Sequence, residues 1–112
     1  MNASLISTHV LDTARGKPAA GIAVRLQNTD GAEIARGETD AAGRVGELGP
    51  ESLPAGTYRL IFDTGAYFEQ DAGDSAPFFP EVTLTFTVAA GEAHYHVPLL
   101  LSPFAYSTYR GN

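Results

Sequence analysis

Hydrophobic and polar residues alternate along most of this chain with a period of two, which is typical of β-strands. The clearest run is residues 82–88, where Val82, Leu84, Phe86 and Val88 share one face and three threonines share the other. We expect the other strands in residues 5–12, 22–28, 32–40, 57–65, 94–100 and 105–110. Turns containing Gly or Pro separate these runs, and only residues 65–73 favour a helix, which would be short. The pattern predicts an all-β, antiparallel β-sandwich of about seven to eight strands with one short helix.

Length and composition predict a single domain over residues 1–112. Of the 112 residues, 44% are hydrophobic and 18% are charged, and a chain of this size buries enough apolar surface for one core. The sequence contains no cysteine, which excludes disulfide bonds, thiolate catalysis and cysteine-ligated metals. A net charge of −6 with only 7 basic residues argues against binding to a nucleic-acid backbone.

The hydrophobic segments are too short to suggest a membrane protein. A membrane-spanning helix needs about 20 apolar residues, and no run in the sequence approaches that length. The opening MNASLISTHV lacks the basic region and the long apolar segment of a signal peptide. We therefore expect a soluble, cytoplasmic protein that binds no membrane.

Three histidines are the side chains best suited to chemistry. His9 shares a predicted strand face with Ser7, and His94 and His96 share one face of another predicted strand. A histidine on a strand often makes only a structural hydrogen bond. A His-x-His pair can ligate zinc, but the motif is too common to indicate zinc alone. A nucleophile formed by Ser7 and His9 is disfavoured, because alternate strand residues lie about 7 Å apart and no orienting carboxylate is evident.

Two arginines complete the candidates. Arg44 follows the turn-forming sequence DAAG, and Arg110 belongs to the segment HYHVPLLLSPFAYSTYRGN, which runs from His94 to Asn112. Both arginines are ordinarily solvated surface charges. The apolar run of that segment predicts burial, in place of the fraying that is usual near a chain end. The residues alone leave open how these basic and imidazole side chains are grouped.

Five segments spread over the chain resemble the transthyretin-related family. They are STHVLDTARGKPA, DAAGR, YRLIFDTGAYF, FFPEV and HYHVPLLLSPFAYSTYRG. Two branches share the fold of this family. The hormone-carrying transthyretins have lysine at the position of His9, and they lack both the HYHVP and the YRG motifs. The chain therefore resembles the other branch, the 5-hydroxyisourate hydrolases.

The resemblance implies a transthyretin-like sandwich that assembles as a homotetramer, a dimer of dimers that encloses a channel. It places the reaction site in that channel and gives catalytic roles to His9, Arg44 and His94, with His96 as a supporting group. Substrate binding is assigned to the last four residues, which are Tyr109, Arg110, Gly111 and Asn112. The family usually ends in serine where this chain has Asn112, whose amide also donates and accepts hydrogen bonds. No metal or cofactor is implied.

The implied substrate is 5-hydroxyisourate, a small molecule made from urate, and the implied reaction opens its six-membered ring at an amide bond. A neutral imidazole, with a pKa of about 6.5, is a suitable base for water. We therefore expect His9 and His94 to activate and orient water, and Arg44 to stabilise the oxyanion that forms. Two alternatives stay open. One is a small-molecule carrier that uses the same channel without turnover, and the other is a zinc-dependent hydrolase built on the three histidines.

Overall fold

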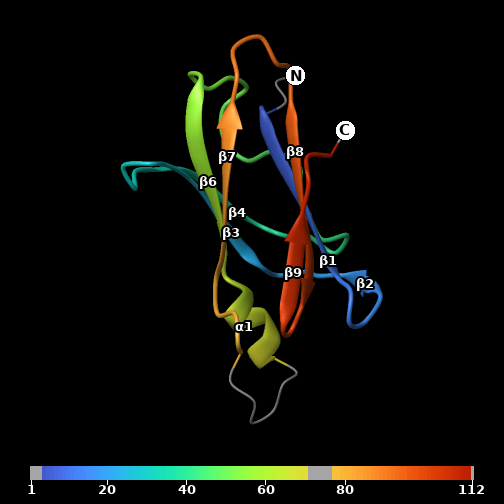
Figure 1. The fold of residues 1–112 in the computed structure, drawn as a ribbon. Coiled ribbons are helices and arrows are strands. Elements are labelled where there is room, and N and C mark those ends of the chain that lie inside the picture. Colours follow the sequence, from blue (N-terminus) through green and yellow to red (C-terminus); the bar gives the residue numbers. More distant parts are fainter. Residues whose placement is uncertain (1–3, 71–76, 112) are drawn as a thin grey trace.

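Two β-sheets packed face to face form the body of the protein (Figure 1). The computed structural model describes residues 4–70 and 77–111. The first sheet has the order β2 (Lys17–Pro18), β1 (Ile6–Asp12), β8 (Tyr95–Ser102) and β9 (Ala105–Thr108), and β5 (Arg44–Val45) also pairs with β1. The second sheet has the order β4 (Glu33–Glu38), β3 (Ala23–Asn28), β6 (Gly56–Phe62) and β7 (Val82–Val88). The expected sandwich is confirmed.

Burial follows the alternation that the sequence shows. In β7, Val82, Leu84 and Val88 are buried, and the threonines between them are exposed. Burying side chains of this size contributes about 1.5–3 kcal/mol each, which explains why the two sheets pack through these faces. The expected helix is α1 (Thr64–Glu69), directly after β6; part of the segment expected to be helical lies outside the described residues. In the part of the chain that the structure describes, no helix is long and apolar enough to cross a membrane.

One strand pair departs from the antiparallel arrangement. β1 and β8 run parallel, with Ser7 beside His96 and His9 beside Pro98. Every other strand pair in the described part of the chain is antiparallel. Parallel neighbours need a long crossover connection, and here that connection contains the whole second sheet. The pair therefore joins two segments that are far apart in the sequence.

The expected burial of residues 94–112 is only partly correct. Leu99 and Leu101 of β8 are fully buried, but Phe104 is 77% exposed and all four residues of β9 are exposed. β9 lies at the edge of the first sheet and has β8 as its strand neighbour. A single chain therefore covers the core strand and leaves the edge strand open to solvent.

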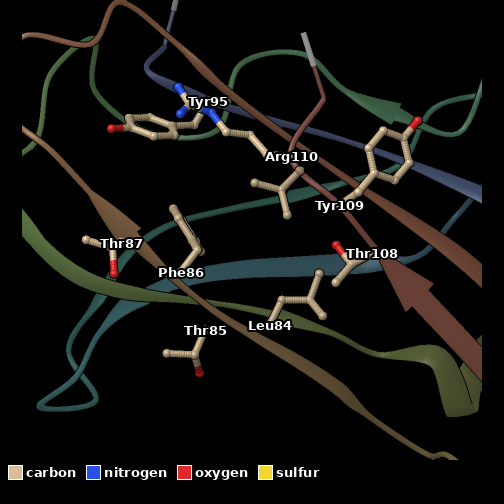
Figure 2. Close-up of a pocket in the computed structure, with 9 residues that line it drawn as sticks. Leu84, Thr85, Phe86, Thr87, Tyr95, Thr108, Tyr109 and Arg110 are labelled. Atoms are coloured by element: carbon tan, nitrogen blue, oxygen red, sulfur yellow. The ribbon is translucent and has the colours of Figure 1, made fainter.

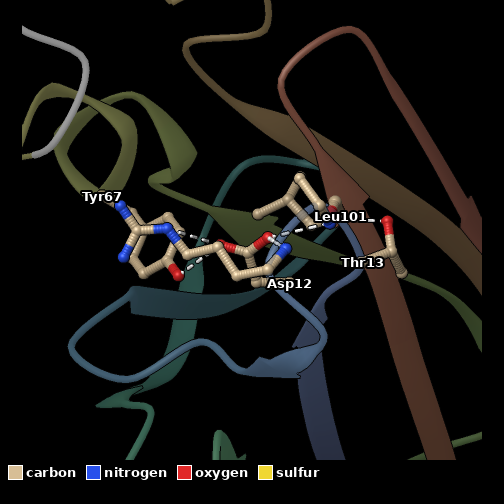
Figure 3. Close-up of polar contacts among 6 residues, drawn as sticks. Asp12, Thr13, Tyr67 and Leu101 are labelled. Atoms are coloured by element: carbon tan, nitrogen blue, oxygen red, sulfur yellow. Dashed lines mark hydrogen bonds and ion pairs between the residues drawn. The ribbon is translucent and has the colours of Figure 1, made fainter.

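A buried carboxylate ties α1 to the end of β1 (Figure 3). Asp12 is only 3% exposed, and its Oδ2 accepts a 2.6 Å hydrogen bond from the hydroxyl of Tyr67. Its Oδ1 accepts hydrogen bonds from the backbone N–H groups of Ala14 and Arg15, and the Arg15 guanidinium lies 3.9 Å from Oδ2. A buried charge is tolerated when it is paired and hydrogen-bonded in this way. The contacts of Asp12 thus anchor the helix to the first sheet.

Candidate active site

The outer face of the first sheet carries a group of basic and imidazole side chains. The strand register pairs Ser7 with His96 and His9 with Arg44 of β5, and paired residues on neighbouring strands present their side chains on the same face. His94, directly before β8, has the same parity as His96. We call these five residues the histidine cluster. Three strands thus bring together the predicted catalytic residues and the predicted supporting histidine.

A tight turn delivers Arg44 to the histidine cluster. Asp40 Oδ1 accepts hydrogen bonds from two backbone N–H groups of the turn, one of them that of Arg44 at 2.9 Å. This hydrogen bond from Arg44 is the largest cause that lowers the pKa of the Asp40 carboxyl. Gly43 has a φ of 77°, and a Cβ there would lie 2.4 Å from the carbonyl oxygen of Val10, so only glycine fits. The predicted DAAGR turn is therefore confirmed, and it places Arg44 opposite His9.

The same turn holds His9. Its Nε2 lies 2.9 Å from the carbonyl oxygen of Ala42. Because a carbonyl oxygen can only accept, Nε2 must carry the hydrogen, and in neutral His9 the unprotonated nitrogen is Nδ1. His9 is partly buried. Its ring is thus fixed by the loop that also carries Arg44.

Ser7 links the other two histidines. Its Oγ lies 2.8 Å from His94 Nε2 and 2.8 Å from His96 Nδ1. The remaining ring nitrogen of His94, Nδ1, lies 3.1 Å from the carbonyl oxygen of Ser4. The sequence suggested Ser7 only as a weak partner of His9, whereas its hydroxyl is engaged by the two histidines beside β1. The missing information was the pairing of β1 with β8, since all three residues have outward parity in their strands.

The histidine cluster borders a shallow hollow of about 250 Å³, lined by Ser7, Thr8, Arg44, Gly46, His94 and His96. Partial burial lowers the pKa of His96, and the positive charges of Arg44, His9 and His94 lower it further. His96 is therefore neutral at pH 7, which is the form that accepts a proton. Within residues 4–70 and 77–111, no group of three or more His, Cys, Asp or Glu side chains is arranged to hold a metal ion.

The tail reaches the histidine cluster through Gly111. Its backbone N–H donates a 2.7 Å hydrogen bond to the carbonyl oxygen of His96. A Cβ at Gly111 would lie 2.7 Å from Cδ2 of His96, which is closer than side-chain atoms pack. Glycine at this position therefore lets the tail lie directly against the imidazole of His96. Asn112, the last predicted substrate-binding residue, lies outside the described residues.

Arg110 and Tyr109 lie elsewhere in a single chain (Figure 2). The Arg110 guanidinium stands 4.5 Å from the centre of the Tyr95 ring and makes a 3.0 Å ion pair with Glu92. Arg110 and Tyr109 line a separate hollow of about 330 Å³ beside β7. Because Tyr95 is a core residue, Arg110 faces the opposite side of the first sheet from His96. A single chain therefore does not bring these two predicted substrate-binding residues to the histidines.

Comparisons with known proteins agree on one family. The HIUase/Transthyretin family model matches residues 6–111. The 5-hydroxyisourate hydrolase of Salmonella typhimurium is 45% identical over 113 residues, which cover 97% of this chain and 82% of that protein. The structure of Klebsiella pneumoniae 5-hydroxyisourate hydrolase matches 100% of both chains with a TM-score of 0.86 and 38% identity. Sea bream transthyretin in complex with thyroxine has a TM-score of 0.84 and 37% identity, and the match covers 96% of this chain and 94% of that one.

Proposed function

The chain belongs to the HIUase/Transthyretin family, and we propose that it is a 5-hydroxyisourate hydrolase whose reaction takes place at the histidine cluster. Relatives with this activity match nearly its whole length. The overall fold does not separate a hydrolase from a carrier, because the hydrolase and the transthyretin structures match almost equally well. The observation that carries the proposal is a neutral imidazole, His96, beside the permanent cation Arg44 at one hollow.

We propose His96 as the general base, whereas the resemblance gave His96 only a supporting role and named His9 and His94 as the histidines that activate and orient water. Both ring nitrogens of His94 are already engaged, one by Ser7 and the other by the Ser4 carbonyl. Among the described residues, His96 hydrogen-bonds to Ser7 through Nδ1, which leaves Nε2 available to a ligand in the hollow that His96 lines. His9 would orient the substrate or water from beside Arg44, its neighbour across the strands, with its Nε2 held by Ala42.

The proposed reaction needs no group beyond these side chains and water. His96 takes a proton from water while the water oxygen attacks the carbonyl carbon of the cyclic amide. Arg44 stabilises the oxyanion, a contribution commonly worth about 10²–10³ in rate. When the oxyanion collapses, the C–N bond breaks and the imidazolium returns its proton to the departing nitrogen. The result is the ring-opened product and neutral His96, ready for a second cycle.

We propose that the site is completed by assembly into a homotetramer, a dimer of dimers. The exposure of β9, of Phe104 and of Tyr109 supports association, because clustered exposed apolar side chains mark contact surfaces. Assembly would also give a role in substrate binding to Tyr109, Arg110, Gly111 and Asn112, the first two of which line a separate hollow in one chain. We further propose one hydrolase domain over residues 1–112 and a cytoplasmic location, with which the absence of cysteine is consistent.

The decisive experiment generates 5-hydroxyisourate from urate with urate oxidase and follows its ultraviolet absorbance with and without the protein. We expect the protein to accelerate the decay, and a metal chelator to leave that acceleration unchanged. Decay at the uncatalysed rate would refute the hydrolase and favour the carrier. Activity that a chelator removes and zinc restores would favour the metal-dependent alternative.

A further inference from the structure

We propose that Ser7 is a positioning residue, which holds His96 in the tautomer that leaves Nε2 free to accept a proton. The inference concerns the same site as the proposed hydrolase function and rests on that function for its catalytic part. Its structural part is a statement about where the imidazole hydrogens lie, and this part is measurable without substrate.

The direction of each hydrogen bond follows from the carbonyl of Ser4. A carbonyl oxygen can only accept, so His94 Nδ1, at 3.1 Å, must be the donor. In a neutral His94 ring, Nε2 is then an acceptor, and the hydroxyl of Ser7 donates its only hydrogen to it across 2.8 Å. The Ser7 oxygen is left to accept, so the contact of 2.8 Å with His96 must be a donation from Nδ1–H. With Nδ1 protonated, neutral His96 carries its lone pair on Nε2.

Reversing the hydrogen bond between Ser7 and His96 is unfavourable. If Ser7 donated to His96 Nδ1, its oxygen would have to accept from His94 Nε2, and His94 would then be protonated on both nitrogens. That extra positive charge would lie beside His96, whose protonation the neighbouring Arg44, His9 and His94 already disfavour. With both imidazoles neutral, the hydrogen bonds can therefore be donated in only one order. His96 donates to Ser7, Ser7 donates to His94, and His94 donates to the Ser4 carbonyl.

The burial of Ser7 and the packing of His96 both restrict the arrangement. Ser7 is 8% exposed, so water competes little for its hydroxyl. Gly111 packs against the ring of His96 at Cδ2 and Cγ, which limits ring rotation about the Ser7 contact. A base that is already in the required tautomer and orientation needs no rearrangement before it takes the proton.

The same contacts also allow Ser7 to be read as a nucleophile, with His94 as its base. The structure favours the positioning role, because Ser7 is buried and its oxygen both donates to His94 and accepts from His96. An attacking oxygen would have to give up the contact with His96 and become accessible to the substrate. The two roles differ in whether an acyl group is transiently attached to Ser7.

The test compares Ser7→Ala, Ser7→Thr and the control Ser102→Ala. Ser102 lies at the other end of β8, and the change to alanine there also removes a serine hydrogen bond to a neighbour, the Ala105 carbonyl. We expect kcat of Ser7→Ala to fall about 10- to 100-fold, part of what a general base contributes, with KM little changed. Ser7→Thr retains a hydroxyl and should recover most of the loss, and Ser102→Ala should match the unaltered protein.

The second measurement is nitrogen NMR of the protein with ¹⁵N-labelled histidine, at a pH at which His96 is neutral. We expect protonated Nδ1 and unprotonated Nε2 for His96 in the unaltered chain, and a mixture of tautomers in Ser7→Ala. An unaltered protein with His96 protonated on Nε2 would overturn the inference even if Ser7→Ala failed to fold. So would a folded Ser7→Ala with full kcat, or an acyl group found on Ser7 by mass spectrometry during turnover. An unaltered protein that shows the expected tautomer but no hydrolysis would instead refute the hydrolase function.

Discussion

The two ends of β1 both carry polar side chains, but the charged groups around these side chains differ. At one end, the carboxylate of Asp12 is buried and receives hydrogen bonds from Tyr67 and from backbone N–H groups, with the guanidinium of Arg15 nearby. At the other end, Ser7 and His9 lie beside the guanidinium-bearing Arg44 and two further histidines. The groups that shift the pKa of His96 are Arg44, His9 and His94, and each lowers it.

This difference in charge distinguishes the stabilising contacts of Asp12 from the reactive histidine cluster. Around Asp12 each interaction neutralises or satisfies the buried charge, so the region gains stability from it. In the histidine cluster, burial and the neighbouring positive groups lower the pKa of His96 beside a hollow, which gives a neutral base next to the cation Arg44. Two sites on one strand of seven residues can therefore be told apart by charge sign and access to solvent.

The largest effect should come from His96→Ala. Removing the proposed base should lower the rate of 5-hydroxyisourate hydrolysis by about 10² or more, and the partly exposed site should leave thermal unfolding almost unchanged. His94→Ala should cost less, because both ring nitrogens of His94 are engaged by Ser7 and the Ser4 carbonyl. Both rates are measured by the absorbance assay, with unfolding followed by circular dichroism. A variant His94→Ala that is far more damaging than His96→Ala would argue against His96 as the base and favour His94.

An intermediate effect, on stability, should come from the other end of β1. Tyr67→Phe removes the hydroxyl that donates to Asp12 and should lower the free energy of unfolding by about 1–3 kcal/mol, while turnover per folded molecule is retained. Urea denaturation measures the first quantity and the absorbance assay the second. Tyr106→Phe is the matched control, since Tyr106 is 40% exposed. If Tyr67→Phe were as stable as this control but slower in turnover, the contrast between the two ends would fail.

The smallest effect is a displacement of the pH profile. A general base acts only when neutral, so kcat/KM should stay constant as the pH falls from 8 until it approaches the pKa of His96, and then decline. Because that pKa is lowered, the decline should lie below 6.5. Arg44→Gln removes one of the charges that lower it, so the decline should move to higher pH in the residual activity of this variant. A decline above 6.5 in the unaltered protein, or one that Arg44→Gln does not move, would argue against His96 as the base.

The strands could be predicted from sequence because the alternation is local. The polar neighbours of Val82, Leu84 and Val88 are enough to predict that these three side chains point inward, and all three are buried in the structure. The same holds for the DAAGR turn, whose Asp40 and Gly43 act within five residues. Parity also placed His94 and His96 correctly on one face.

Partners across strands could not be predicted in this way. Parity says which face Ser7 occupies but not that β8 lies beside it in parallel, so the link between Ser7 and His96 was missed. The contact of Asp12 with Tyr67 spans 55 residues and has no local signal. Arg110 was grouped with the histidines by resemblance, and only the register of Gly111 against His96 shows that its neighbour Arg110 faces the other way.

The parallel pairing of β1 with β8 also bears on when the protein becomes active during its synthesis. Ser7 and His96 are 89 residues apart, and at about 5–20 residues per second the ribosome needs about 4–18 seconds to add the intervening chain. The four strands of the second sheet are all made in that interval, and their hairpins close over shorter loops. The nascent chain can therefore form much of its second sheet before β8 pairs with β1, while Ser7 still lacks its contacts with His94 and His96. The histidine cluster then forms in one late step, when β8 inserts beside β1.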